Sequence, residues 1–135
     1  MKVKLSPQER AALRKQGFAA SKLAGANAHE LAALCALPLA RCRYLVAIAD
    51  FQTLAGVGPA AAQDLWDLGC RSLADVGKGD PVAMYHELSR QVGVALDPCV
   101  EDVFRCAIAQ VRDPHLPLEE TNWWHWKPKR GEAME

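Results

Sequence analysis

The chain has 135 residues, of which 50% are hydrophobic and 24% are charged, and this suits one folded domain with a buried core. The 16 basic and 16 acidic side chains cancel, so the overall basic charge of many nucleic-acid-binding proteins is absent. No apolar run approaches the roughly 20 residues of a membrane helix. The N-terminal residues lack the apolar core of a secretory signal. Together with the five cysteines, these features predict a cytoplasmic protein with reduced thiols and no membrane partner.

The charges are unevenly distributed along the chain. Residues 1–30 carry six basic and two acidic side chains, whereas residues 31–120 carry seven basic and twelve acidic ones. Residues 121–135 are again slightly basic. Basic ends are typical of solvent-exposed termini, and they also suit arms that contact phosphate groups.

Helix start signals recur in the first half of the chain. Residues 6–9 read Ser-Pro-Gln-Glu, a capping box with proline at the first helical position, and predict a helix that ends near Gly17. Residues 27–30 repeat this kind of signal and begin a helix that runs to about Ala36. A further helix is expected over residues 38–54, where apolar side chains recur at helical spacing.

Aspartate–proline pairs punctuate the second half. The pairs at 80–81 and 97–98 each predict a helix with an aspartate cap and proline at its first position. The second of these helices has one apolar face, should cross the core with Glu101 and Asp102 facing solvent, and should end at the pair 113–114. No segment alternates apolar and polar residues as a strand does. The predicted fold class is all-α, a compact single domain of about six helices.

The most informative stretch is residues 51–65, where an apolar helix meets Gly-Val-Gly and another helix begins at once. Gly56 and Gly58 permit positive φ angles in a tight turn and allow another molecule to approach the backbone closely. The free N–H groups and the dipole at the start of the second helix favour a phosphate group there. This stretch therefore predicts an anion site that needs no basic side chain.

The same stretch resembles the helix-hairpin-helix family, whose hairpin reads Leu-Pro-Gly-Ile-Gly-Pro-Lys-x-Ala-x-x-Leu and whose usual continuation is met by residues 69–76. The matching hairpin residues are Leu54, Gly56, Val57, Gly58, Pro59, Ala62 and Leu65. The resemblance implies a fold built around this hairpin and contacts between its amides and one DNA strand's backbone.

Within that resemblance, the expected phosphate contacts come from the amides around Gly56, Gly58 and Ala60. Some hairpins of the family also hold a monovalent cation, and the backbone carbonyls that would do so here belong to Gln52, Leu54 and Val57. The chain departs from the family pattern at Ala60, where the family has lysine, and at Asp64, where it has a basic residue. Both departures weaken the expected phosphate contact.

Two later stretches, residues 97–106 and 123–127, resemble the small bacterial pathogenicity-locus family. That family joins a helix-hairpin-helix to an Asp-x-Cys-x-x-x-x-Phe-Arg-Cys helix and a Trp-Trp-x-Trp tail. Some members are labelled mitomycin-resistance proteins, which implies a link to DNA damage or repair. We divide the chain into a basic N-terminal helical extension (1–26), a helix-hairpin-helix core domain (27–112) and a tryptophan-rich tail packed on the core (113–135).

Three tryptophans, Trp123, Trp124 and Trp126, lie within four residues of the tail. One interpretation is an aromatic platform for nucleic-acid bases, with the basic side chains of residues 127–130 on the backbone beside it. The other is a tail that folds back so that the indoles cover the core. We favour the second, because free tryptophans on a flexible tail would promote aggregation.

Neither catalysis nor a bound metal or cofactor is expected. The pairs Cys35 and Cys42, and Cys99 and Cys106, are seven residues apart, about 10 Å along a helix and too far to share one metal ion. We interpret these thiols as small buried apolar side chains. A glycosylase of the helix-hairpin-helix kind is disfavoured, since the lyase types carry lysine where this chain has Ala60 and the chain is too short to enclose a flipped base.

The sequence thus predicts a non-enzymatic, sequence-independent DNA-binding or scaffold module that holds DNA weakly at Gly56, Val57, Gly58 and Ala60. The alternative is an adaptor for an unidentified protein partner, in which the hairpin is only structural. A basic rim around the hairpin would favour DNA, and an acidic or occluded rim would favour the adaptor. The candidate rim residues are Lys22, Arg41, Arg43 and, as the DNA contact we select, Arg71.

Overall fold

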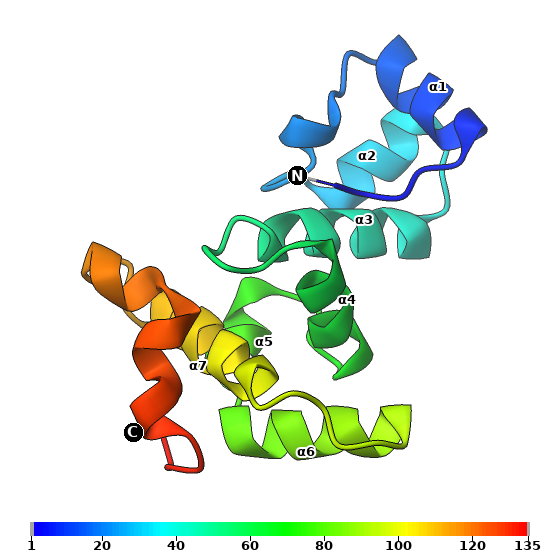
Figure 1. Cartoon of the computed structure of the whole chain (residues 1–135). Helices are drawn as coiled ribbons and strands as arrows, with labels where there is room; N and C mark the ends of the chain where they lie inside the picture. Colours follow the sequence, from blue (N-terminus) through cyan, green and yellow to red (C-terminus); the bar gives the residue numbers. More distant parts are fainter. Residues whose placement is uncertain (1, 135) are drawn as a thin grey trace.

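Every regular element in the computed structural model, which describes residues 2–134, is a helix (Figure 1). The α-helices are α1 (Pro7–Lys15), α2 (Ala28–Cys35), α3 (Leu39–Phe51), α4 (Pro59–Asp67), α5 (Leu73–Gly77), α6 (Pro81–Val92) and α7 (Cys99–Arg112). Three short 3₁₀ helices are η1 (Ala20–Lys22), η2 (Leu118–Thr121) and η3 (Trp123–Lys129). No strand occurs among the described residues, so the predicted all-α class is confirmed. Met1 of the predicted N-terminal extension and Glu135 of the predicted tail lie outside the described residues.

Side-chain caps begin several helices, as the sequence predicts. The capping box at residues 6–9 is complete in both directions, with N···O distances of 3.1 and 2.8 Å. Asp80 accepts a hydrogen bond from the Val82 amide at 3.0 Å and caps α6. Asp97 likewise accepts from the Cys99 amide at 2.9 Å, and α7 begins at that cysteine, one residue later than predicted.

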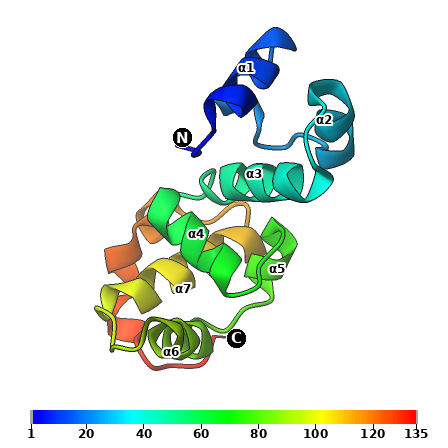
Figure 2. The ribbon, with the colours of Figure 1, turned by 90° about the vertical axis from the view of Figure 1, so that its right-hand side faces the viewer.

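Helix α3 is buried on two opposite faces and separates two hydrophobic clusters. In Figure 2 it lies between α1 and α2 above and α4 to α7 below. One face joins the N-terminal cluster, which includes residues of α1 and α2, and the other joins the larger cluster of α4 to α7. The α3 residues in the first cluster are Cys42, Val46 and Ala49, and those in the second are Ala47, Ile48 and Phe51. The N-terminal helices and the hairpin are therefore attached to the same rigid element.

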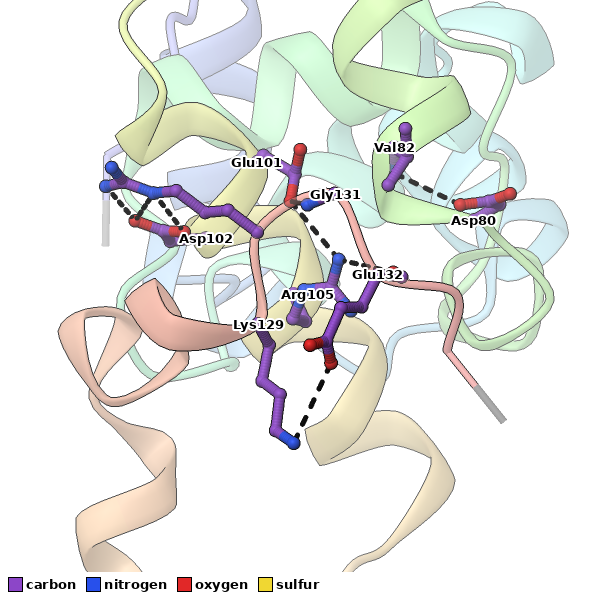
Figure 3. Close-up of polar contacts among 9 residues, drawn as sticks. Asp80, Val82, Glu101, Asp102, Arg105, Lys129, Gly131 and Glu132 are labelled. Carbon is purple, nitrogen blue, oxygen red and sulfur yellow. Dashed lines mark hydrogen bonds and ion pairs between the residues drawn. The ribbon is translucent and has the colours of Figure 1, made fainter.

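Helix α7 crosses the larger cluster, with Phe104 and Ile108 fully buried in it. The prediction that Glu101 and Asp102 face solvent is wrong, because these side chains are only 8% and 0% exposed. The C-terminal tail covers this side of α7 and supplies their partners (Figure 3).

An ion pair fastens the tail to Asp102. Arg130 donates from Nε to both carboxylate oxygens, at 2.9 and 3.0 Å, and from Nη2 to one of them. The carboxylate is fully buried, whereas the arginine side chain is 35% exposed. Because buried charges require partners, this pair stabilises the folded tail. It also occupies one of the basic side chains of the tail that could otherwise contact a phosphate.

A second set of contacts surrounds Glu101 (Figure 3). Its carboxylate accepts from the Gly131 amide at 2.9 Å and from Arg105 Nη2 at 3.2 Å. The same guanidinium nitrogen donates to the carbonyl of Glu132 at 2.8 Å. Residues 130–132 are thereby hydrogen-bonded to α7 along their backbone as well as through a side chain.

Substitution of Arg130 should destabilise the protein. In the Arg130→Ala variant, Asp102 keeps its buried charge but loses its partner, and we expect the free energy of unfolding to fall by roughly 1–3 kcal/mol. Lys129→Ala is the control, because its ion pair with Glu132 is exposed and should contribute less than about 1 kcal/mol. Urea unfolding measures both variants. Equal midpoints for the two would show that the buried pair does not hold the tail.

Candidate nucleic-acid interface

Residues 52–58 form the turn between α3 and α4. The Val57 amide donates to the Leu54 carbonyl at 3.1 Å, and the Val57 side chain is 5% exposed and anchors the turn in the core. Gly56 has a φ of 81°, in the left-handed region that favours glycine. Gly58 has a φ of −90° and a ψ of −171°, which any residue can adopt. The prediction of positive φ thus holds for the first glycine and is wrong for the second.

The start of α4 presents free backbone donors to the surface. Gly58 is the residue before the helix, and no described side chain caps it. The amides of Ala60 and Ala61 have no acceptor within the helix, because the first turn of any α-helix leaves its N–H groups unpaired. A Cβ built on Gly58 would meet no described atom within 4 Å. This helix end is open, and its dipole adds positive potential where an anion could approach.

Residues 2–6, which precede α1 and which we call the N-terminal segment, lie beside the start of α4. The Gln52 side chain binds its backbone in both directions, accepting from the Lys2 amide at 3.0 Å and donating to the Lys2 carbonyl at 2.7 Å. Lys2 and Lys4 line a cavity of about 410 Å³ together with the first two residues of α4. Both lysines are exposed. The site therefore has two basic side chains that come from a distant part of the sequence.

Arg41 holds the second lysine in place. Its guanidinium donates to the Lys4 carbonyl at 2.8 Å and to the two carboxylate oxygens of Glu9 at 2.7 and 3.1 Å. The hydrogen bond from Arg41 lowers the pKa of Glu9 from 4.5 to about 2. The structure thus gives this predicted rim arginine a positioning role next to the hairpin.

The selected DNA contact Arg71 does not lie at the start of α4. Its guanidinium stacks 3.8 Å from the Trp66 ring centre and donates to the Trp66 carbonyl at 2.8 Å, beyond the C-terminal end of that helix. Arg43 lies with it around a second cavity, of about 620 Å³, which also contains Asp50. Lys22 lies exposed in η1. The predicted basic rim is therefore dispersed. Lys2 and Lys4, which were not among the predicted rim residues, lie at the start of α4 instead.

The tail and α7 contact the hairpin as well. The Ala55 amide donates to Gln110 Oε1, and Gln110 Nε2 donates to the Ala55 carbonyl, both at 2.9 Å. The Cδ1 atom of Trp123 lies 3.9 Å from the position that a Cβ on Gly56 would occupy. The turn is thus held from two sides, by the Gln52 contacts and by these.

The three tail tryptophans differ in exposure. Trp123 and Trp126 are half-buried, and the Trp126 indole donates to the Glu120 carbonyl at 2.8 Å. Trp124 is 56% exposed. Its ring centre lies 5.7 Å from that of Trp123, and the two planes meet at 84°. The exposed Trp124 indole therefore packs against Trp123, which contacts the hairpin.

The sequence also raised a cation site, metal ligands, a membrane helix and the cysteines. The Leu54 carbonyl, one of the three expected cation ligands, accepts the Val57 amide and keeps a second lone pair, so the cation site stays a prediction. No group of three or more histidine, cysteine or acidic side chains in residues 2–134 could hold a metal ion. Within the same range, no helix has the length and apolar character to cross a membrane. The thiols are free, and burial raises the pKa of each: Cys35, Cys42, Cys70, Cys99 and Cys106.

Comparison with known proteins identifies the family. Residues 45–132 match the sequence model of the family described as Pathogenicity locus. The chain belongs to this family. A relative, the mitomycin resistance protein McrB of Streptomyces lavendulae, is 33% identical over 85 residues, which cover 63% of this chain and 77% of the relative. No solved structure matches the chain significantly.

The family match contains the hairpin, α7 and most of the tail. It begins within α3, so the N-terminal segment with its two lysines and Arg41 lies outside it. The turn and the indole beside it thus belong to the part shared with the Pathogenicity locus family, and the lysines belong to the part of this chain that precedes the match.

The two glycines should respond differently to alanine. Gly56→Ala forces a side chain into the left-handed region, and although its Cβ would have room beside Trp123, we expect a loss of about 1–2 kcal/mol in the free energy of unfolding. Gly58→Ala needs no change of backbone or packing, and we expect a smaller loss of about 0.5 kcal/mol, because alanine is a poorer residue than glycine before a helix. Chemical denaturation of both variants tests this. A Gly58→Ala loss as large as that of Gly56→Ala would contradict the turn geometry.

Proposed function

We propose that the chain binds the phosphate backbone of DNA without regard to base sequence and without catalysing a reaction. The proposal depends mainly on one observation: Lys2 and Lys4 line one cavity together with Pro59 and Ala60, at the start of α4 that no described side chain caps. Backbone donors at a helix start bind anions, and two lysines beside them add full positive charges. None of these groups distinguishes one base from another.

The resemblance to the helix-hairpin-helix pattern supports the same site. In that pattern a lysine stands where this chain has Ala60, which is the main objection to DNA binding from the sequence. Lys2 and Lys4 line the same cavity as Ala60, although they come from a distant part of the sequence. We infer that they replace the missing charge, and that Gln52 and Arg41 position them for it.

The name of the relative suggests a cellular role for such binding. It is a mitomycin resistance protein, and we extend the proposal to a link between this chain and DNA damage. In such a role the chain would hold damaged or exposed DNA for other proteins.

A protein-interaction adaptor is the second candidate. It is favoured by exposed apolar side chains outside the hairpin: Leu34 of α2 at 52%, Val92 of α6 at 56%, and Val94 of the loop after α6 at 62% exposure. An adaptor would bind a partner protein stoichiometrically and would not need the lysines.

The two lysines provide the test of the proposed function. We expect wild type to bind a labelled mixed-sequence duplex weakly, with a slope of log K against log salt near −2, because about two phosphates are neutralised. Lys2→Gln/Lys4→Gln should lower the affinity roughly tenfold or more at low salt and flatten the slope. Fluorescence anisotropy over a salt series measures both quantities.

Lys15→Gln/Lys78→Gln is the matched control, since it removes the same charge from exposed lysines elsewhere. Its affinity should stay within about twofold of wild type if the contact is local. Equal losses in the two double variants would mean that only net charge matters. No duplex binding by wild type at low salt would refute the proposal and leave the adaptor.

A further inference from the structure

We propose that the hairpin and the tail form one site for single-stranded DNA, in which Trp124 stacks on an unpaired base near the phosphate held at α4. This inference rests on the proposed function and names its substrate class. Two observations that the proposed function does not use support it: the Trp124 indole is exposed on the tail, and Trp123 beside it contacts the hairpin.

The spacing places the exposed ring close to the turn. Trp123 contacts the Gly56 position at 3.9 Å, and the Trp124 ring centre is 5.7 Å from that of Trp123. The exposed ring is therefore near the Gly56 turn, and Gly58, the residue before α4, follows only two positions later in the chain. A strand whose phosphate is bound at α4 could therefore reach the indole with a nearby base.

The short helix η3 sorts the side chains of the tail into two groups. Side chains three residues apart in a 3₁₀ helix lie above one another. Trp123 and Trp126 are such a pair, and both are half-buried. Trp124 and Lys127 are the next pair, and both are exposed. The outward side of η3 thus combines an aromatic surface with a positive charge, as single-strand sites do.

The indole is also held in position, which distinguishes it from a tryptophan on a flexible arm. Edge-to-face packing on Trp123 supports it from one side. Helix η3, which carries Trp124, is held by the hydrogen bond from Trp126 to the Glu120 carbonyl and, just after its end, by the ion pair of Arg130 with Asp102. A ring that already packs against a neighbour loses less conformational entropy on stacking than a ring on a free arm.

An unpaired base is required by the geometry of stacking. In a duplex each base is covered by its neighbours, so a ring face beside the backbone finds no free base surface. In a single strand every base has a free face, and the contact tolerates any sequence. The site should therefore bind a single strand more tightly than a duplex.

The test compares Trp124→Ala with wild type on a labelled oligothymidylate and on a labelled mixed-sequence duplex of equal length, at low salt. Wild type should bind the single strand more tightly. Trp124→Ala should weaken single-strand binding by roughly 5- to 100-fold and change duplex binding by less than about twofold. Leu118→Ala is the matched control, since it removes another exposed apolar side chain of the tail, 82% exposed, and should change neither affinity.

The outcomes separate this inference from the proposed function. If Trp124→Ala binds the single strand as wild type does, or weakens both substrates equally, stacking is refuted and duplex binding through the lysines stands. If Leu118→Ala weakens single-strand binding as much as Trp124→Ala, the tail acts as a general apolar surface and the inference also fails. If wild type binds neither substrate, both proposals are wrong. Thermal melts of each variant confirm that it is folded.

Discussion

Helix α3 packs against α1 and α2 with one face and against the helices of the larger cluster with the opposite face, and the arrangement of the candidate site depends on this double burial. Both faces of α3 are packed, so the same helix contacts the N-terminal helices and leads into the hairpin. Gln52, at the end of α3, then joins the two through paired hydrogen bonds to Lys2. A surface helix with one apolar face would position the hairpin but leave the lysines free.

Buried charge has a comparable role at the other end of the molecule. A carboxylate in the core is costly unless it is paired, and Arg130 of the tail is the ion-pair partner of Asp102. The folded position of the tail is therefore coupled to the interior of α7. This coupling places Trp123 against the turn and leaves Trp124 exposed. An interaction that stabilises the fold thus also arranges the surface that we propose for DNA.

Local signals in the sequence were sufficient to predict the fold class, the caps of Ser6 and Asp80, and the turn at Gly56. Each of these depends on residues within a few positions of one another, which is the range that periodicity and capping rules describe. The error at Gly58 has a similar origin, since a glycine before a helix can serve as an extended residue as well as a left-handed one. The exposed placement of Asp102 was wrong because helical period alone cannot foresee a tail that covers a second face.

The parts of the site that sequence reasoning missed are those made by distant contacts. Lys2 and Gln52 are 50 positions apart, and nothing in either local pattern links them. The positive charge of residues 1–30 was a weak signal for a basic arm. Charge alone did not distinguish the exposed lysines from Arg41, whose guanidinium is bound to Glu9 and to the Lys4 carbonyl. Charge counts describe how much charge a segment has, and only packing decides which charges remain available.

The most direct test of the central claim, that the open start of α4 binds phosphate through its backbone, is duplex binding by Gly58→Val. The extended backbone and the free space at this position predict a folded protein, with a small loss of stability because valine is a poorer residue than glycine before a helix. The branched side chain would extend into the open space at the start of α4 and obstruct the approach of a phosphate, so the affinity should fall by roughly tenfold or more. A folded Gly58→Val protein that binds duplex DNA as tightly as wild type would contradict the claim.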